Sequence, residues 1–136
     1  MAHREAADHM RILVIEDSRF LRTLTQRALL KAGYDVVTEA DGQQGVLRAQ
    51  EIQPDLIVLD MMLPTMEGTT VLRALKNDSR TEAVPVVVVS GLSGRNEQKL
   101  KKLGAAAYFE KSSLELDKSA DGLVQIIQSI SVKLPA

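Results

Sequence analysis

Short apolar runs alternate along the chain with stretches of helical periodicity, and each run ends in polar residues. Runs that are apolar at consecutive positions are typical of strands buried on both faces of a parallel sheet. We therefore predict strands at residues 11–15, 35–38, 56–59, 86–89 and 106–109.

The stretches between these runs carry apolar residues at helical spacing. The first helix is predicted over 18–32, and Gly33 stands where a helix commonly ends. Its apolar face is expected to carry Phe20, Leu21, Leu24 and Ala28. Further helices are predicted after a cap at Asp41 and over 69–76, 96–103 and 121–131. Strands and helices in alternation, joined by right-handed crossovers, indicate an α/β fold with a doubly wound parallel sheet.

Composition narrows the class of protein. The chain has 136 residues, 45% of them hydrophobic, and a net charge of −1, which fits one domain and argues against direct nucleic-acid binding. It contains no cysteine, which excludes disulfides, thiolate metal sites and cysteine nucleophiles. No apolar run is long enough to span a membrane and no secretory signal is recognisable, so we expect a cytoplasmic protein without membrane insertion.

The domain is expected to begin after a short tail. Residues 1–9 carry both histidines, His3 and His9, and no apolar segment, which indicates a disordered tail or a cloning remnant. We expect a single domain over 10–132 and a short carboxyl-terminal tail over 133–136.

Polar side chains follow the predicted strands at the point where each strand ends. The carboxyl ends of parallel strands share one edge of the sheet, where doubly wound folds place their sites. Taken singly, each of these side chains has an ordinary explanation as a cap, a turn residue or a solvated charge. Together they bring three carboxylates, a hydroxyl and an ammonium group to one edge, from Glu16, Asp17, Asp60, Ser90 and Lys111.

This set suits the binding of a divalent cation and a phosphoryl group. Three neighbouring carboxylates repel one another unless a cation lies between them, and Mg²⁺ prefers oxygen ligands. The absence of histidine and cysteine from this edge disfavours zinc. The ammonium group of Lys111 can pair with a phosphoryl oxygen, and an aspartate can act as a nucleophile that forms an acyl phosphate.

The motifs around these residues resemble the receiver domain of two-component response regulators, of the stand-alone, chemotaxis-regulator type. The likeness covers about 11–130, and its motifs occur in the expected order at 15–18, 59–68, 89–91 and 108–111. The resemblance implies a five-stranded (βα)5 flavodoxin-like fold with strand order 2-1-3-4-5. It also implies a phosphorelay protein that changes conformation on phosphorylation, with no turnover of an external substrate.

The resemblance assigns a role to each matching residue. Asp60 matches the phosphoacceptor, and the metal ligands would be Glu16, Asp17, Asp60 and the main-chain carbonyl of Met62. Ser90, Gly91 and Lys111 match the phosphate-binding positions, and Ser90 and Tyr108 match the pair that changes conformation on phosphorylation.

The resemblance also concerns the lifetime of the phosphoryl group. Met62 and Leu92 occupy positions that flank the path of the hydrolytic water, where bulky apolar side chains predict slow dephosphorylation. The cofactor would be Mg²⁺ (or Mn²⁺), the phosphoryl donor a histidine kinase or phosphotransfer protein, and the downstream partner is not specified.

One departure from the family pattern follows Lys111, where receiver domains commonly have a proline and this chain has Ser112. A cis bond before a residue other than proline costs roughly 2.5–4 kcal/mol, so we predict a trans Lys111–Ser112 bond. We also expect a longer connection over 112–121 into the last helix. Because no output domain is recognisable after this helix, the chain is either a stand-alone regulator or an excised domain.

Three other functions compete with this interpretation. A pseudo-receiver that binds partners without phosphorylation would lack the acids or the lysine, and none of these is missing. A phosphatase of the haloacid dehalogenase type would need a second aspartate where Met62 stands. A flavodoxin would need a phosphate-binding loop rich in Thr, Ser and Gly after the first strand, which 17–19 does not provide.

Overall fold

The centre of the protein is a parallel sheet whose strands lie in the order β2-β1-β3-β4-β5. The structure is a computed structural model that describes residues 10–63, 66–91, 97–113 and 120–133. The strands are β1 (Arg11–Ile15), β2 (Asp35–Glu39), β3 (Leu56–Asp60), β4 (Val86–Ser90) and β5 (Ala107–Glu110). The predicted fold class and strand order are confirmed.

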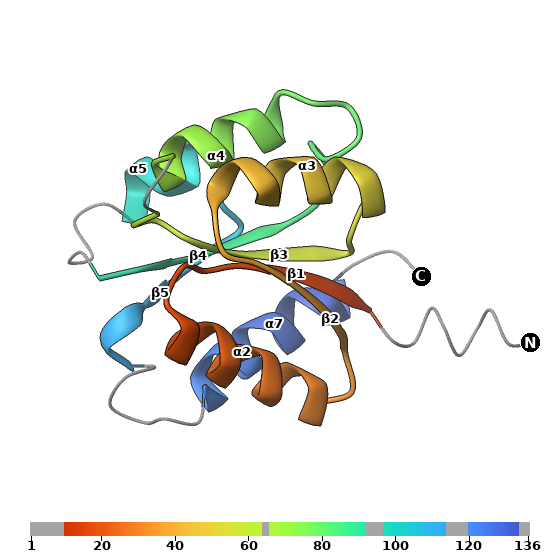
Figure 1. The fold of residues 1–136 in the computed structure, drawn as a ribbon, viewed down its shortest axis with the longest axis vertical. Helices are drawn as coiled ribbons and strands as arrows, with labels where there is room; N and C mark the ends of the chain where they lie inside the picture. Colours follow the sequence, from red (N-terminus) through yellow and green to blue (C-terminus); the bar gives the residue numbers. More distant parts are fainter. Residues whose placement is uncertain (1–9, 64–65, 92–96, 114–119, 134–136) are drawn as a thin grey trace, which may run out of the picture.

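Helices cover both faces of this sheet (Figure 1). One layer contains α2 (Arg19–Lys31) and α7 (Asp121–Lys133), and the other contains α3 (Gly42–Ile52), α4 (Gly68–Lys76) and α5 (Glu97–Lys102). Each face has its own apolar core, so the strand residues alternate between the two cores. The five strands and the helices α2, α4, α5 and α7 lie within two residues of their predicted bounds, and α3 follows the predicted cap at Asp41. Asn96, the predicted start of α5, lies outside the described residues.

Burial follows position in the sheet. Every residue of β3 and β4 is buried, as are all of β1 except its first residue, because helices cover these inner strands on both faces. The edge strands β2 and β5 are half-buried. The expectation that the run at 106–109 forms a fully buried strand is therefore wrong, since β5 has a neighbouring strand on one side only.

The face that α2 turns to the core matches the predicted one except at Phe20: Leu21 is buried, and Leu24 and Ala28 pack against the same core. Its buried residues are Leu21, Thr25 and Leu29, which recur every fourth position along one stripe of the helix. The expectation for Phe20 is wrong, because it is 58% exposed, and the polar Thr25 takes a core position.

Side-chain caps fix where two helices begin. The Ser18 hydroxyl accepts a hydrogen bond from the main-chain N–H of Leu21 at 3.3 Å, and the Asp41 carboxylate accepts one from Gln44 at 2.7 Å. Gly33 follows the end of α2 with a φ of 101°, a conformation that favours glycine. Both caps lie in the short turns that follow β1 and β2, so they help to set how the chain turns at the carboxyl edge of the sheet.

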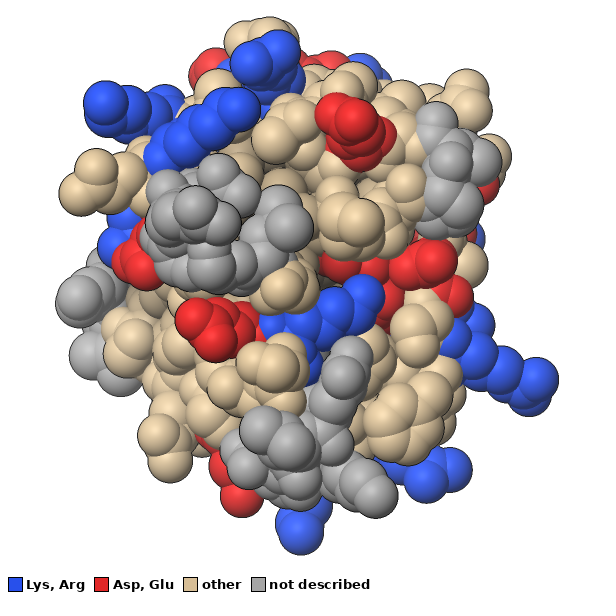
Figure 2. Space-filling model, turned by 90° about the vertical axis from the view of Figure 1, so that its left-hand side faces the viewer, with Lys and Arg blue, Asp and Glu red and all other residues tan. Residues whose placement is uncertain are grey.

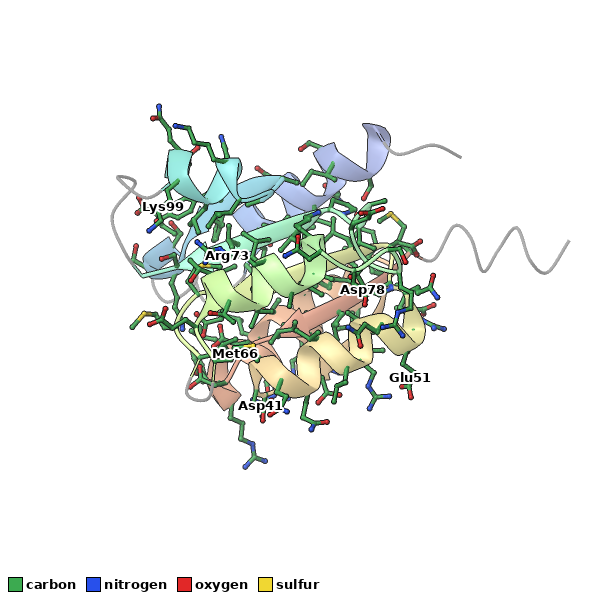
Figure 3. All side chains as sticks on the ribbon, turned by 90° about the horizontal axis from the view of Figure 1, so that it is seen from above. Asp41, Glu51, Met66, Arg73, Asp78 and Lys99 are labelled. Carbon is green, nitrogen blue, oxygen red and sulfur yellow. The ribbon has the colours of Figure 1, made fainter. Side chains whose placement is uncertain are left out.

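Gly68, the first residue of α4, lies close to Met61, which follows β3. The N–H of Gly68 donates to the carbonyl oxygen of Met61 at 3.1 Å, and a Cβ atom on Gly68 would lie 2.5 Å from the Met61 Cα. Only glycine permits this approach without a shift of the main chain. Figure 3 looks onto the layer formed by α3 and α4, with Met66, two residues before α4, labelled.

Two further expectations concern the main chain. Within the described ranges no peptide bond is cis, so the trans Lys111–Ser112 bond is confirmed. The chain is helical at 111–113, and most of the expected longer connection lies at 114–119, outside the described residues. None of the described helices is both long and apolar enough to cross a membrane.

Candidate functional site

The candidate site lies at the carboxyl edge of the sheet, where β1, β3, β4 and β5 end. Figure 2 looks onto this edge and shows acidic side chains gathered beside a basic one near the middle of the face. The described structure brings together Glu16, Asp17 and Asp60, with Lys111 beside them, as the sequence predicts.

Glu16 and Asp17 occupy the turn between β1 and α2. The N–H of Glu16 continues the pairing of β1 with β2 by donating to the Glu39 carbonyl at 3.0 Å. Its carboxylate is almost fully buried and accepts a hydrogen bond from the N–H of Ser18 at 3.1 Å. The Asp17 side chain is exposed at the mouth of the site. The Glu16 carboxylate is therefore buried inside the site, and the Asp17 carboxylate lies at its solvent-exposed edge.

Asp60 is the last residue of β3 and is 1% exposed. Its Oδ1 accepts a hydrogen bond from the N–H of Met62 at 3.0 Å, and its Oδ2 lies 3.1 Å from the Lys111 Nζ. Both carboxylate oxygens thus have a donor, which fixes the plane of the group. A buried carboxylate held in one orientation is suited to in-line attack on a phosphorus atom.

Lys111 follows β5 and reaches across the sheet edge to two acids. Its Nζ lies 3.1 Å from Asp60 and 3.5 Å from Glu16, and its side chain is only 16% exposed. Burial alone would lower the pKa of Lys111, but the charges of Glu16 and Asp60 outweigh it and raise that pKa. Lys111 therefore remains a cation and partly neutralises the acids.

A single ammonium group does not neutralise three carboxylates. Burial, together with a hydrogen bond and charge repulsion from Asp60, raises the pKa of Glu16 from 4.5 to about 8, although Ser18 and Lys111 act in the opposite direction. Glu16 thus holds a proton near neutral pH unless a further cation is present.

The donor set fits a divalent cation. One carboxylate oxygen from each of Glu16, Asp17 and Asp60 lies within 4.8 Å of the other two. The set consists entirely of oxygen atoms, which suits Mg²⁺, Mn²⁺ or Ca²⁺ better than zinc. The pKa of Glu16, raised first by burial and then by Asp60, is consistent with a site where a further cation would stabilise the charged carboxylates.

The remaining predicted residues lie around this cluster. Ser90 is buried at the end of β4, and Gly91 is exposed directly after it. Tyr108 is half-buried on β5, where it packs against the core beneath α3, α4 and α5.

The two residues predicted to slow dephosphorylation are Met62 and Leu92. Met62 is 60% exposed beside Asp60. Leu92 lies outside the described residues, so slow dephosphorylation through Met62 and Leu92 stays a prediction.

Arg22 contributes to the site although the sequence did not indicate it. Its guanidinium Nη1 donates to the carbonyl oxygens of Glu16 at 3.0 Å and Asp17 at 3.2 Å. The only available signal is that the first turn of α2 holds arginines and no acid, an unfavourable arrangement beside the helix dipole.

Comparison with known proteins identifies the family. The pattern of the response regulator receiver domain matches residues 12–120. Over 103 residues, or 74% of this chain and 42% of the relative, the chain is 41% identical to the DNA-binding dual master transcriptional regulator RpaA of Synechocystis sp.. The chain spans less than half the length of RpaA and of several other curated relatives.

Solved structures agree in fold. The chemotaxis response regulator CheY4 of Vibrio cholerae is 29% identical with a TM-score of 0.72, covering 76% of this chain and 87% of CheY4. The Mn²⁺-bound form of response regulator Rcp1 is 28% identical with a TM-score of 0.77, covering 93% of this chain and 99% of Rcp1. The acidic cluster fits the metal-binding phosphorylation site of this family. By sequence pattern, strand order and site composition, the chain belongs to the response regulator receiver domain family.

Proposed function

We propose that Asp60 accepts a phosphoryl group in a Mg²⁺-dependent reaction and that this modification controls the binding of a partner protein. The observation that carries the proposal is the position of Asp60, buried at the end of β3 between two further acids and the ammonium group of Lys111. Phosphoryl transfer depends mainly on positioning and charge neutralisation, and this site offers both.

The chemistry assigns a role to each side chain. An Asp60 carboxylate oxygen forms a bond to phosphorus while the bond from phosphorus to the donor's nitrogen breaks, and that nitrogen takes up a proton. Lys111 pairs with a phosphoryl oxygen as negative charge moves onto Asp60. Ser90, the last residue of β4, and Gly91, which follows it, would donate hydrogen bonds to the other phosphoryl oxygens.

Glu16, Asp17, Asp60 and the main-chain carbonyl of Met62 would hold the cation. Bound there, Mg²⁺ supplies the positive charge that neutralises phosphoryl and carboxylate oxygens in the transition state. The close approach of the three carboxylates and the Mn²⁺-bound form of the relative Rcp1 support this assignment.

The phosphoryl donor in this proposal is a histidine kinase or a phosphotransfer protein, and the protein acts in the cytoplasm. The domain spans 10–132, and it performs no turnover of an external substrate. Membership of the receiver family supports a kinase as donor. No feature of the described residues supports a pseudo-receiver, because every acid and the lysine of the site are in place.

A test of phosphorylation uses a small phosphoramidate or acyl-phosphate donor and intact-mass spectrometry. We expect the mass to rise by one phosphoryl group with Mg²⁺ and to stay unchanged with a chelator. Hydroxylamine should remove the adduct, since it cleaves acyl phosphates. An adduct that forms without a divalent cation, or that resists hydroxylamine, would contradict the proposal.

The proposal includes a switch between Ser90 and Tyr108. A phosphoryl group on Asp60 would draw the Ser90 hydroxyl toward it, and the half-buried Tyr108 ring would move into the vacated space. Replacing Tyr108 with alanine should leave phosphorylation intact but reduce a partner's preference for the phosphorylated form. Isothermal titration of the partner with both forms measures this preference. If the preference survives in Tyr108→Ala, Tyr108 only packs against the core.

A further inference from the structure

Arg22 is a cation whose hydrogen bonds are directed at the main chain of the acidic turn. It lies in the first turn of α2 and binds two consecutive carbonyl oxygens, those of Glu16 and Asp17, through the same guanidinium nitrogen. A cation at this end of a helix interacts unfavourably with the helix dipole. The two hydrogen bonds offset this cost, so the side chain is held against the turn.

These carbonyl groups belong to the two residues that supply neighbouring carboxylates to the cluster. The Glu16 carboxylate is also fixed by the N–H of Ser18. The Asp17 carboxylate is exposed and accepts no hydrogen bond within the part of the chain that the structure describes. The position of the Asp17 carboxylate therefore depends on the main chain at Asp17. Arg22 fixes that main chain through its hydrogen bond to the Asp17 carbonyl oxygen.

We propose that Arg22 is a positioning residue for the divalent cation, and this inference rests on the proposed function. By bridging the two carbonyl oxygens, Arg22 fixes the orientation of consecutive peptide groups, so that the carboxylates of Glu16 and Asp17 face the same cation. It contacts neither the cation nor the phosphoryl group. Mg²⁺ requires nearly ideal octahedral geometry, so a small rotation of the turn weakens binding.

The test compares two arginines of the same helix. Arg22→Met keeps the length of the side chain and removes its donors, and Arg27→Met removes the same charge from an exposed position of α2. In isothermal titration with Mg²⁺ alone, we expect Arg22→Met to weaken binding about tenfold, as loss of a residue that supports metal ligands typically does. Arg27→Met should stay within about twofold, because long-range charge effects are screened by salt.

A second measurement separates positioning from general loss of structure. The Mg²⁺ concentration for half-maximal phosphorylation should rise in Arg22→Met, while the rate at saturating Mg²⁺ should stay close to the parent rate. Arg22→Lys keeps one charged donor and should bind Mg²⁺ with intermediate affinity. If Arg22→Met does not fold, the comparison rests on Arg22→Lys, for which parental affinity would overturn the inference.

The outcomes distinguish this inference from the proposed function. If the parent protein binds Mg²⁺ and is phosphorylated, but Arg22→Met and Arg27→Met bind Mg²⁺ equally well, only the role of Arg22 is overturned. If the parent protein binds no Mg²⁺ and is not phosphorylated, both are overturned.

Discussion

Replacing Asp60 by asparagine should abolish phosphorylation while the protein stays folded. An amide oxygen is too weak a nucleophile to form an acyl phosphate. Asparagine has nearly the same shape, so the packing at the end of β3 is kept. Its single amide oxygen can accept the hydrogen bond that Asp60 receives from either Met62 or Lys111, but its NH2 group cannot accept the other one. Intact-mass spectrometry after incubation with a small phosphoryl donor and Mg²⁺ measures the result.

The same substitution should change how stability depends on pH without a divalent cation. The pKa of Glu16 is raised to about 8 in the folded protein, so between about pH 4.5 and 8 the folded state binds more protons than the unfolded state. The free energy of unfolding therefore falls as pH rises through this window. Asp60→Asn removes a negative neighbour, lowers the pKa of Glu16 and makes this dependence shallower. Urea unfolding with a chelator, at several pH values, measures the difference.

Asp35→Asn is the matched control, because Asp35 is exposed at the start of the edge strand β2, opposite the carboxyl edge. It should be phosphorylated like the parent and keep the parent's pH dependence. A phosphoryl adduct of parental yield on Asp60→Asn would show that another residue is the acceptor.

The inner strands could be predicted from the sequence because their runs lack polar residues. Val86–Val89 has no hydrophilic side chain to place in water, so burial on both faces is the only favourable arrangement. The convergence of Asp60 and Lys111 then follows from topology, since parallel strands end at the same edge. These parts of the site required no knowledge of side-chain contacts.

Other features depend on tertiary contacts that leave no clear sequence pattern. Thr25 lies in the core stripe of α2 while Phe20 is exposed, because the contacts between α2 and the sheet fix the rotation of the helix. The partial exposure of β5 reflects its edge position, which its apolar run does not reveal. Arg22 binds main-chain carbonyl groups, and any residue can supply these, so no partner side chain marks its role.

Replacing Lys111 by methionine should destabilise the protein when no divalent cation is present. The ammonium group lies 3.1 Å from Asp60 and 3.5 Å from Glu16, two acids that are 0% and 6% exposed at their side chains. Removing one partner of a buried pair typically costs about 3–5 kcal/mol. Because Glu16 already holds a proton near neutral pH, only the Asp60 carboxylate loses its counter-charge, and we expect a smaller loss, about 2–3 kcal/mol in the free energy of unfolding. Urea unfolding at neutral pH with a chelator measures this loss.

Adding Mg²⁺ should recover part of the loss in Lys111→Met, because the cation supplies the missing positive charge to the same carboxylates. Phosphorylation should nevertheless remain slow at saturating Mg²⁺, since no ammonium group pairs with the phosphoryl oxygen. Lys101→Met is the control: Lys101 pairs with Glu97 at 2.8 Å, but both side chains are largely exposed, and such pairs contribute about 0–1 kcal/mol. A loss in Lys111→Met no larger than in Lys101→Met would mean that the acids at the sheet edge do not need Lys111 as a counter-charge.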